Sequence, residues 1–337
     1  MTGVQTCALP ICELDVAQRL NEDLLRLSRQ RSDAAGLVLG HLSCGRDLML
    51  VGRFASSQSH LEDGMALYDP VSHRSLGQQA GSGDPRVNLQ AYSAIVLFCP
   101  GFPDQALAWS NAAITEAREL AHPPSVAVGL TFGARLLSLV GDNAALGERT
   151  DQLFSLAIEQ GFPFWRAEGT TFRGWVKVKN GDVAEGMSLL HSGSSAYRAS
   201  GAVTMMPGFL ALLAGACETA GRVEEGLTLL DEGLQLVERT GERQFAAELN
   251  RYKGQLLLRQ GKDEAAEELY RKALSIAEEQ EAKLWELRAA VSLARLWRDR
   301  RYRAEARDLL VPVYGWFTEG FDTPDLKDAK ALLDELA

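Results

Sequence analysis

The residues that most often perform chemistry are not arranged as a catalytic site in this 337-residue sequence. The five histidines lie far apart, and no two have the H-x-x-x-H spacing that places two metal ligands on one helical face. Gly261-Lys262 lacks both the upstream glycine and the following Ser or Thr of a phosphate-binding loop. The spacing of the serine, histidine and acidic residues indicates neither a Ser-His-Asp triad nor a pair of catalytic carboxylates. We therefore expect no catalytic residue, no metal and no cofactor, and we predict that this chain is not an enzyme.

Cysteine usage and charge narrow the choice of compartment and partner. The irregularly spaced Cys44, Cys99 and Cys217 match neither a zinc-ligand pattern nor a secreted disulfide framework, which predicts buried free thiols in a cytoplasmic protein. The net charge is −10, from 35 basic and 45 acidic residues, and no basic stripe is present. We therefore expect neither nucleic acid nor an anionic membrane as the main partner. The sequence has no run of 18 apolar residues that would predict a membrane span.

Glycines recur every 20 residues through much of the chain. The uninterrupted series is Gly141, Gly161, Gly181, Gly201, Gly221, Gly241 and Gly261, and Gly101 falls on the same spacing. Glycine readily adopts the left-handed conformation that ends a helix, so this spacing predicts helices of about 14 to 16 residues separated by short turns. Alternate stretches resemble one another more than they resemble their neighbours. The repeating unit is therefore 40 residues long and is predicted to be a helical hairpin.

A small residue stands five positions after the turn in most units. These residues are Ala106, Gly186, Gly226, Ala266 and Ala306, whereas Leu146 is an exception. A small side chain allows the second helix of a hairpin to approach the first closely. In the last unit Arg301 replaces the turn glycine.

The repeat predicts an all-α solenoid of about seven hairpins that forms one domain over residues 12–337, in which each hairpin buries its apolar stripe only against adjacent hairpins. We expect an open superhelix with a concave groove. Residues 12–30 are interpreted as a partial repeat, residues 69–86 as a long surface loop rich in helix breakers, and residues 325–337 as a capping helix. Residues 1–11 match the translation of a common sequencing adapter and are excluded as non-native.

The repeat carries a family resemblance. Gly254, Leu257, Gly261, Ala266, Tyr270 and Ala273 stand at the spacings of the small and apolar positions of the tetratricopeptide repeat (TPR). More narrowly, the stretches EQGFPFWRAEGT and WELRAAVSLARLWRD resemble the C-terminal repeat region of large bacterial signalling proteins. Those proteins join a class III adenylate/guanylate cyclase domain, or sometimes a kinase or LuxR-type DNA-binding domain, to an AAA-like ATPase. The resemblance implies a right-handed TPR-like α-solenoid.

The resemblance also implies a binding groove. In TPR stacks, residues two, three, six and ten positions before the turn line the concave face. Here these are Thr131, Arg135, Trp175, Glu218, Arg251, Gln255, Arg259, Arg295 and Arg298. Arginine suits carboxylate or phosphate recognition, and tryptophan can anchor a partner. A protein, a peptide or a small-molecule effector is the expected partner, together with upstream ATPase and cyclase domains of the same polypeptide.

Two classes of function agree with these observations. The first is a non-catalytic sensor or interaction region that regulates upstream ATPase and cyclase domains. The alternative is a free-standing TPR scaffold or adaptor, which would bind partners without controlling an attached enzyme.

Overall fold

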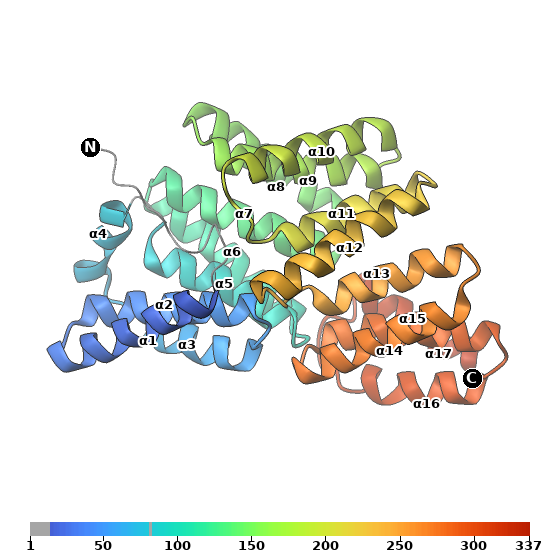
Figure 1. Ribbon diagram of the computed structural model, residues 1–337. Coiled ribbons are helices and arrows are strands. Elements are labelled where there is room, and N and C mark those ends of the chain that lie inside the picture. The colour runs from blue at the N-terminus through green and yellow to red at the C-terminus, as the bar shows by residue number, and fades with distance from the viewer. Residues whose placement is uncertain (1–13, 81–82) are drawn as a thin grey trace.

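The computed structural model describes residues 14–80 and 83–337, so the adapter-like residues 1–11 lie outside the described residues. The described residues form seventeen α-helices and no strand (Figure 1). The helices are α1 (Leu14–Arg31), α2 (Ala34–Leu50), α3 (Phe54–Leu67), α4 (Pro70–Ala80), α5 (Pro85–Phe98), α6 (Pro103–Glu119), α7 (Pro123–Val140), α8 (Asn143–Glu159), α9 (Pro163–Lys179), α10 (Val183–Ala199), α11 (Met206–Thr219), α12 (Val223–Thr240), α13 (Ala246–Arg259), α14 (Asp263–Glu279), α15 (Lys283–Asp299), α16 (Arg303–Tyr314) and α17 (Pro324–Leu336).

The helices pair into hairpins as the repeat predicts. Seven hairpins follow one another, namely α2/α3, α5/α6, α7/α8, α9/α10, α11/α12, α13/α14 and α15/α16, and each packs against the next. The small residue after the turn is fully buried in the units of Ala106, Ala266 and Ala306, because it faces the first helix of its own hairpin. The prediction of an all-α solenoid with about seven hairpins is confirmed.

The turns adopt the backbone conformation that the glycine spacing predicts. Gly141 has φ +84° and its N–H donates to the Leu137 carbonyl, which ends α7. Ala121, Glu281 and Arg301 occupy the same 20-residue spacing and also have positive φ, at +48°, +53° and +69°. The spacing of the turns therefore continues through positions where glycine is absent, at the cost of backbone strain in those residues.

Arg301→Gly is expected to raise the free energy of unfolding by about 1 kcal/mol, because glycine removes the clash of Cβ in the left-handed conformation. Gly261→Ala makes the opposite change at an equivalent turn, because it adds a Cβ to a residue in the left-handed conformation. Gly261 has φ +71° and no atom near the position of an added Cβ, so only backbone strain would act there. Denaturant unfolding of both variants checks this, and a destabilised Arg301→Gly protein would contradict it.

One sequence prediction about local structure is wrong. Residues 69–86 do not form a long loop, because α4 occupies Pro70–Ala80 and α5 begins at Pro85. The residues that suggested a loop act as helix-start signals. The Asp69 carboxylate accepts the Ser72 N–H at 2.9 Å, and the Asp84 carboxylate accepts the Arg86 N–H at 2.8 Å.

The expectation of an open superhelix also needs correction. The stack turns far enough to bring the edge of its N-terminal half against the edge of its C-terminal half, as Figure 1 shows near its centre, where the ends of α2 and α5 approach the starts of α13 and α15. The Leu50 carbonyl accepts the N–H groups of Arg243 and Gln244, at 2.8 and 3.0 Å, and the Cys99 carbonyl accepts the Leu284 N–H at 3.0 Å. We call this contact region the seam. Hairpins distant in sequence thus bury surface against each other, which adjacent-only packing does not predict.

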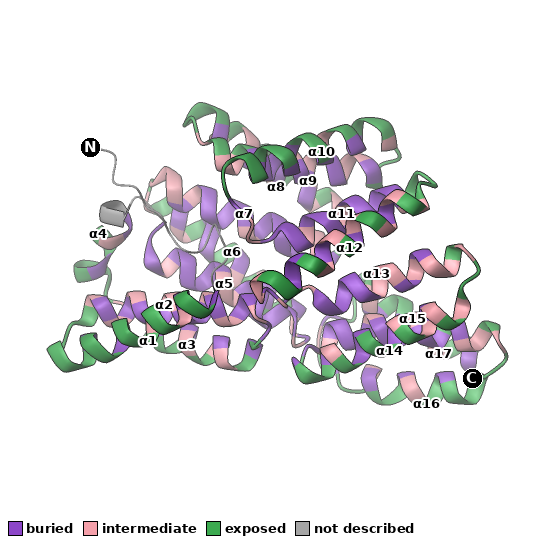
Figure 2. Cartoon of the chain, in the orientation of Figure 1, coloured by how far each residue is buried: buried purple, intermediate pink, exposed green. Residues whose placement is uncertain are grey.

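Because the two halves meet, the largest hydrophobic core contains residues from both of them. Buried residues run along the inner faces of the helices in both halves (Figure 2). Trp285 is 1% exposed and contacts Phe98 of α5 and Phe245 beside α13 through their rings. The three predicted free thiols are free and buried, and burial raises the pKa of Cys44 and Cys217 to about 11.

Helix α7 is the one described helix that is long and apolar enough to cross a membrane, counting by length and composition alone. In the protein, 61% of its apolar window is buried, and it packs between α5, α6, α8 and α9. Those contacts account for its apolar composition as that of a core helix.

The two ends of the solenoid differ. At the C-terminal end, α17 covers the stack with Leu326, Ala329 and Leu332 and exposes polar residues, as the prediction of a capping helix requires. At the other end, α1 packs on α2 but exposes an apolar stripe. The stripe consists of Val16, Leu20, Leu24 and Leu27, of which Leu20 is 59% exposed.

Candidate ligand cavities inside the superhelix

Three adjoining cavities lie inside the closed superhelix. The first, which we call the aromatic cavity, has a volume of about 300 Å³ and is bounded by residues from α2, α5, α7, α9 and α10, with others from the α4–α5 and α10–α11 connections. The middle cavity has about 70 Å³ and shares Met49, Phe132, Arg135 and Met205 with the aromatic cavity. The polar cavity has about 220 Å³ and lies between α7, α9, α13, α15 and α17. The superhelix therefore keeps internal space although its edges meet.

Aromatic rings form much of the wall of the aromatic cavity. Tyr92 of α5 and Phe132 of α7 meet edge to face with ring centroids 4.8 Å apart. Phe164 of α9 and Tyr197 of α10 are 4.9 Å apart. Aromatic pairs of this kind form rigid, apolar walls suited to a flat ligand.

Arg135 stands between the aromatic and middle cavities. Its Nη2 pairs with Glu168 of α9, which is fully buried, and its guanidinium lies 4.5 Å from the centroid of the Phe132 ring. Burial lowers the pKa of Arg135, but the charge of Glu168 more than offsets that effect, so the pKa lies above its ordinary value. Arg135 is therefore a permanent positive group in a wall that also holds several aromatic rings.

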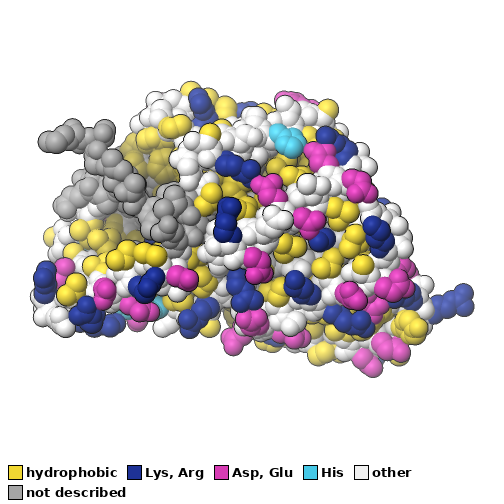
Figure 3. Space-filling model, viewed as in Figure 1, with side chains coloured by type: hydrophobic (Ala, Val, Ile, Leu, Met, Phe, Trp, Pro, Cys, Tyr) yellow, Lys and Arg dark blue, Asp and Glu magenta, His cyan; other side chains and the backbone are white. Residues whose placement is uncertain are grey.

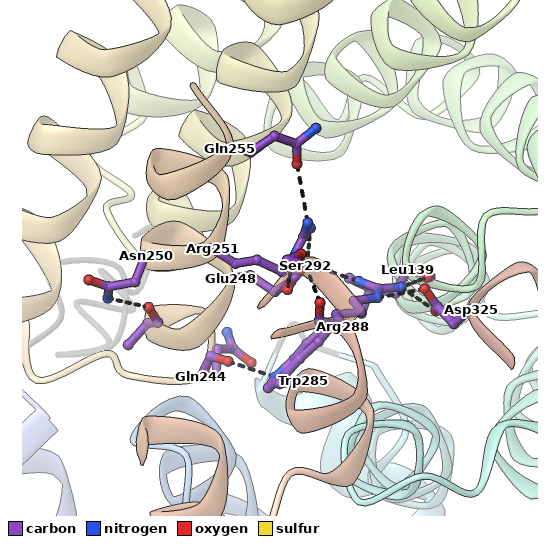
Figure 4. Close-up of polar contacts among 11 residues, drawn as sticks. Leu139, Gln244, Glu248, Asn250, Arg251, Gln255, Trp285, Arg288, Ser292 and Asp325 are labelled. Carbon is purple, nitrogen blue, oxygen red and sulfur yellow. Dashed lines mark hydrogen bonds and ion pairs between the residues drawn. The ribbon is translucent and has the colours of Figure 1, made fainter. Parts of the chain in front are cut away.

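A network of charged residues borders the polar cavity (Figure 4). Glu248 of α13 accepts from Arg251 at 2.6 and 2.9 Å and from Nη1 of Arg288 at 3.1 Å. Arg288 of α15 also binds Asp325 of α17 through two hydrogen bonds, at 3.0 and 2.7 Å, and donates to the Leu139 carbonyl of α7. Burial raises the pKa of Glu248, but the two arginines outweigh it and hold the pKa below its ordinary value. This network joins the two halves of the solenoid.

The structure distributes the nine predicted groove residues over three surroundings. Five border the cavities, namely Thr131, Arg135, Trp175, Arg251 and Arg295. Glu218, Gln255 and Arg259 form a cluster outside the cavity linings, in which the Glu218 carboxylate accepts from the other two and Gln255 accepts from Arg251. Arg298 pairs with Asp299 and with Glu335 of the capping helix. Most of the predicted set therefore faces the interior, although all its arginines already have acidic partners in the chain.

The prediction missed several residues that border the cavities. Arg46 stands six positions before Gly52, so the same counting rule points to it. Glu248 and Arg288 border the middle cavity and stand thirteen positions before their turns, one helical turn beyond the residues that the rule counts. Glu168, the buried partner of Arg135, stands at the same position of its own unit. His41 and His60 also come together, with ring centroids 5.1 Å apart, although they are distant in sequence. Among residues 14–80 and 83–337, no cluster of three His, Cys, Asp or Glu side chains could hold a metal ion.

Comparison with known proteins identifies the architecture. A tetratricopeptide repeat model matches residues 209–279, from within α11 to the end of α14. The chain is a TPR-like α-solenoid. An uncharacterized protein of Rhizobium meliloti (strain 1021) is 28% identical over 272 residues, which make up 80% of this chain and 26% of that protein. The solenoid thus spans about a quarter of the length of this relative.

Solved structures of similar fold have very different sequences. A Rap protein complexed with competence and sporulation factor has a TM-score of 0.58 at 13% identity, covering 96% of the solenoid and 97% of that chain. The APC/C hetero-tetramer Cut9-Hcn1 has a TM-score of 0.54 at 11% identity, with 97% and 53% covered. Aspartyl phosphate phosphatase F of Bacillus subtilis has a TM-score of 0.51 at 11% identity, with 85% and 73% covered. At these identities the similarity shows the fold alone.

Proposed function

We propose that this solenoid is the non-catalytic, ligand-sensing region of a cytoplasmic bacterial signalling protein and that it controls upstream ATPase and adenylate/guanylate cyclase domains. The observation that carries the proposal is the cavity-containing interior of a TPR-like fold. Its walls hold Arg135, Arg251 and Arg295, which the concave-face spacing selects. A TPR-like fold is typical of interaction and regulatory regions, and charged groups among apolar walls are typical of ligand sites.

Four further observations support this role. The Rap protein of similar fold is complexed with competence and sporulation factor, so a solenoid of similar fold can bind a partner. The relative from Rhizobium meliloti is about four times as long as its aligned stretch, which leaves room there for other domains. The apolar outer stripe of α1 offers a packing surface for more of a polypeptide. Charges of both signs mix on the face shown in Figure 3, which suits a protein or small-molecule partner better than nucleic acid.

The test is to recover the coding sequence upstream of residue 13 from the source genome and to express the longer polypeptide. We expect an ATPase module and a cyclase domain, and we expect cyclase activity to change when the charged wall is altered by Arg295→Ala. Arg298→Ala is the matched control, since Arg298 lies outside the three cavities. An upstream reading frame without a nucleotide-binding module, or equal cyclase activity in both variants and the parent, would remove the regulatory role.

The second candidate function is a free-standing TPR scaffold or adaptor, which the fold also supports. In that case the isolated solenoid should capture a defined protein partner, and Arg295→Ala should weaken the capture while Arg298→Ala leaves it unchanged.

A further inference from the structure

We propose that the aromatic cavity binds a small organic acid, with an apolar and preferably aromatic body and one carboxylate group. The inference rests on the proposed function, because it names the ligand class of the same sensing interior. The inference is based on the charged and aromatic side chains that line this cavity.

The first step concerns size and shape. A volume of about 300 Å³ lies at the lower end of the range for small-molecule sites. Rings from four helices surround the space, with Tyr92 on α5, Phe132 on α7, Trp165 on α9 and Tyr197 on α10. An aromatic body would bury its faces against these rings, and a folded peptide of several residues would exceed the volume.

The second step concerns charge. The charged side chains that line the cavity are Arg46 of α2 and Arg135 of α7, and no acidic side chain is among the described residues of its lining. Their partners, Asp47 and Glu168, are 0% exposed and lie behind the arginines, outside the lining. The acids therefore hold the guanidinium groups in place without occupying the cavity. A cationic ligand would meet two arginines and no carboxylate.

The third step concerns the head group. Arg46 binds Asp47 through Nε at 3.0 Å, and Arg135 binds Glu168 through Nη2, so each guanidinium uses only part of its donor set for its acid. Burial raises the pKa of Tyr92, which lines the same cavity, and the charges of Arg46 and Arg135 act in the opposite direction. A carboxylate accepts planar, charge-assisted hydrogen bonds from arginine better than a neutral amide does. Two arginines in the lining of an aromatic cavity therefore favour an organic acid.

Titration calorimetry of the full chain with three probes of one shape tests the assignment. The probes are indole-3-acetate, its neutral analogue indole-3-acetamide, and the cation tryptamine. We expect saturable binding of the acid, at least tenfold weaker binding of the amide, and no binding of tryptamine. Equal affinity for acid and amide, or no binding of the acid up to its solubility limit, would overturn the proposal.

Variants of the wall locate the binding. Arg135→Met alone would leave Glu168 buried without its partner, so it is combined with Glu168→Leu to keep the interior neutral. This double variant should weaken acid binding at least tenfold. Arg46→Met should do so separately, and there Asp47 keeps the hydrogen bond that it accepts from Asn21 at 2.7 Å. Arg259→Met is the control, since Arg259 is an exposed arginine outside the cavities. Unchanged affinity in both wall variants would contradict the assignment of the site.

A carboxylate ligand of this cavity is either a free small acid or the C-terminus of a peptide. Binding of the tripeptide Gly-Gly-Trp, measured with a free and with an amidated C-terminus, distinguishes the two. Tighter binding of the free-ended peptide than of indole-3-acetate assigns the carboxylate to a peptide end, whereas weaker binding assigns it to a free metabolite-sized acid.

The proposed function and the proposed ligand site can fail independently of each other. Acid binding without any change in the cyclase activity of the longer polypeptide removes the regulatory role and keeps the site, while an effector response that survives Arg46→Met removes the site.

Discussion

Glu248→Gln is expected to lower the free energy of unfolding by about 3 to 5 kcal/mol, as measured by denaturant titration. The substitution keeps the shape of the side chain and removes the only carboxylate that pairs with both Arg251 and Arg288 among the described residues. Glu248 is 3% exposed, and both arginines are largely buried. Arg251 would then lack a carboxylate partner in the interior, which costs far more than a surface ion pair is worth.

Glu218→Gln provides the matched control. Glu218 accepts from Gln255 and Arg259, but the Arg259 side chain is 67% exposed and can turn to water when its partner is lost. We expect a loss below about 1 kcal/mol there. Equal losses in the two variants would show that the Glu248 network behaves like a surface pair.

The same network predicts how stability depends on pH. The pKa of Glu248 in the folded protein lies below its ordinary value of 4.5, because the two arginines outweigh the effect of burial. A carboxyl group with a lowered pKa stabilises the fold fully above the pKa of the unfolded chain and loses that contribution as the pH falls through the folded pKa. The stability difference between the parent and Glu248→Gln should therefore be constant above about pH 5.5 and shrink below about pH 4.5. A difference that grows on acidification would contradict the sign of the shift.

The features predicted from sequence are those that depend on local structure. A turn glycine such as Gly141 and a small residue such as Ala266 act within one hairpin, so a repeated pattern reports them directly. Asp69 and Asp84 show where that approach fails. Both are turn-forming residue types, and both cap helices here, because the N-terminus of a helix and the start of a loop share the same preferences.

Closure of the superhelix could not be predicted in the same way. Whether Leu50 meets Gln244 depends on small rotations between successive hairpins that add up over the whole stack. No local pattern encodes that sum. For the same reason only part of the site was predicted. Arg135 and Trp175 face inward whether or not the two halves of the solenoid meet. The hydrogen bond from Arg288 to the Leu139 carbonyl forms only because the two halves do meet.

Trp285→Ala is expected to lower the free energy of unfolding by about 3 to 5 kcal/mol and to open the seam. Trp285 lies where the halves join. Its Nε1 donates to the Gln244 carbonyl at 3.2 Å, its ring meets Phe98, and the neighbouring Leu284 N–H binds the Cys99 carbonyl. Removing the indole leaves a cavity next to the seam hydrogen bonds, so the N-terminal and C-terminal halves should separate before either half unfolds. Hydrogen exchange at the Gln244 and Leu284 amides and the radius of gyration from small-angle scattering measure that separation.

Leu230→Ala separates loss of stability from loss of closure. Leu230 is fully buried in the core of α11–α13, away from the seam, and its truncation should cost about 2 to 5 kcal/mol. Because its contacts lie between adjacent hairpins, we expect the seam amides to keep their protection and the radius to stay unchanged under native conditions. In the Trp285→Ala protein the same amides should exchange faster and the radius should increase. If both variants expand equally, the seam has no role of its own and closure follows from general stability; if neither expands, packing between adjacent hairpins alone sets the shape of the solenoid.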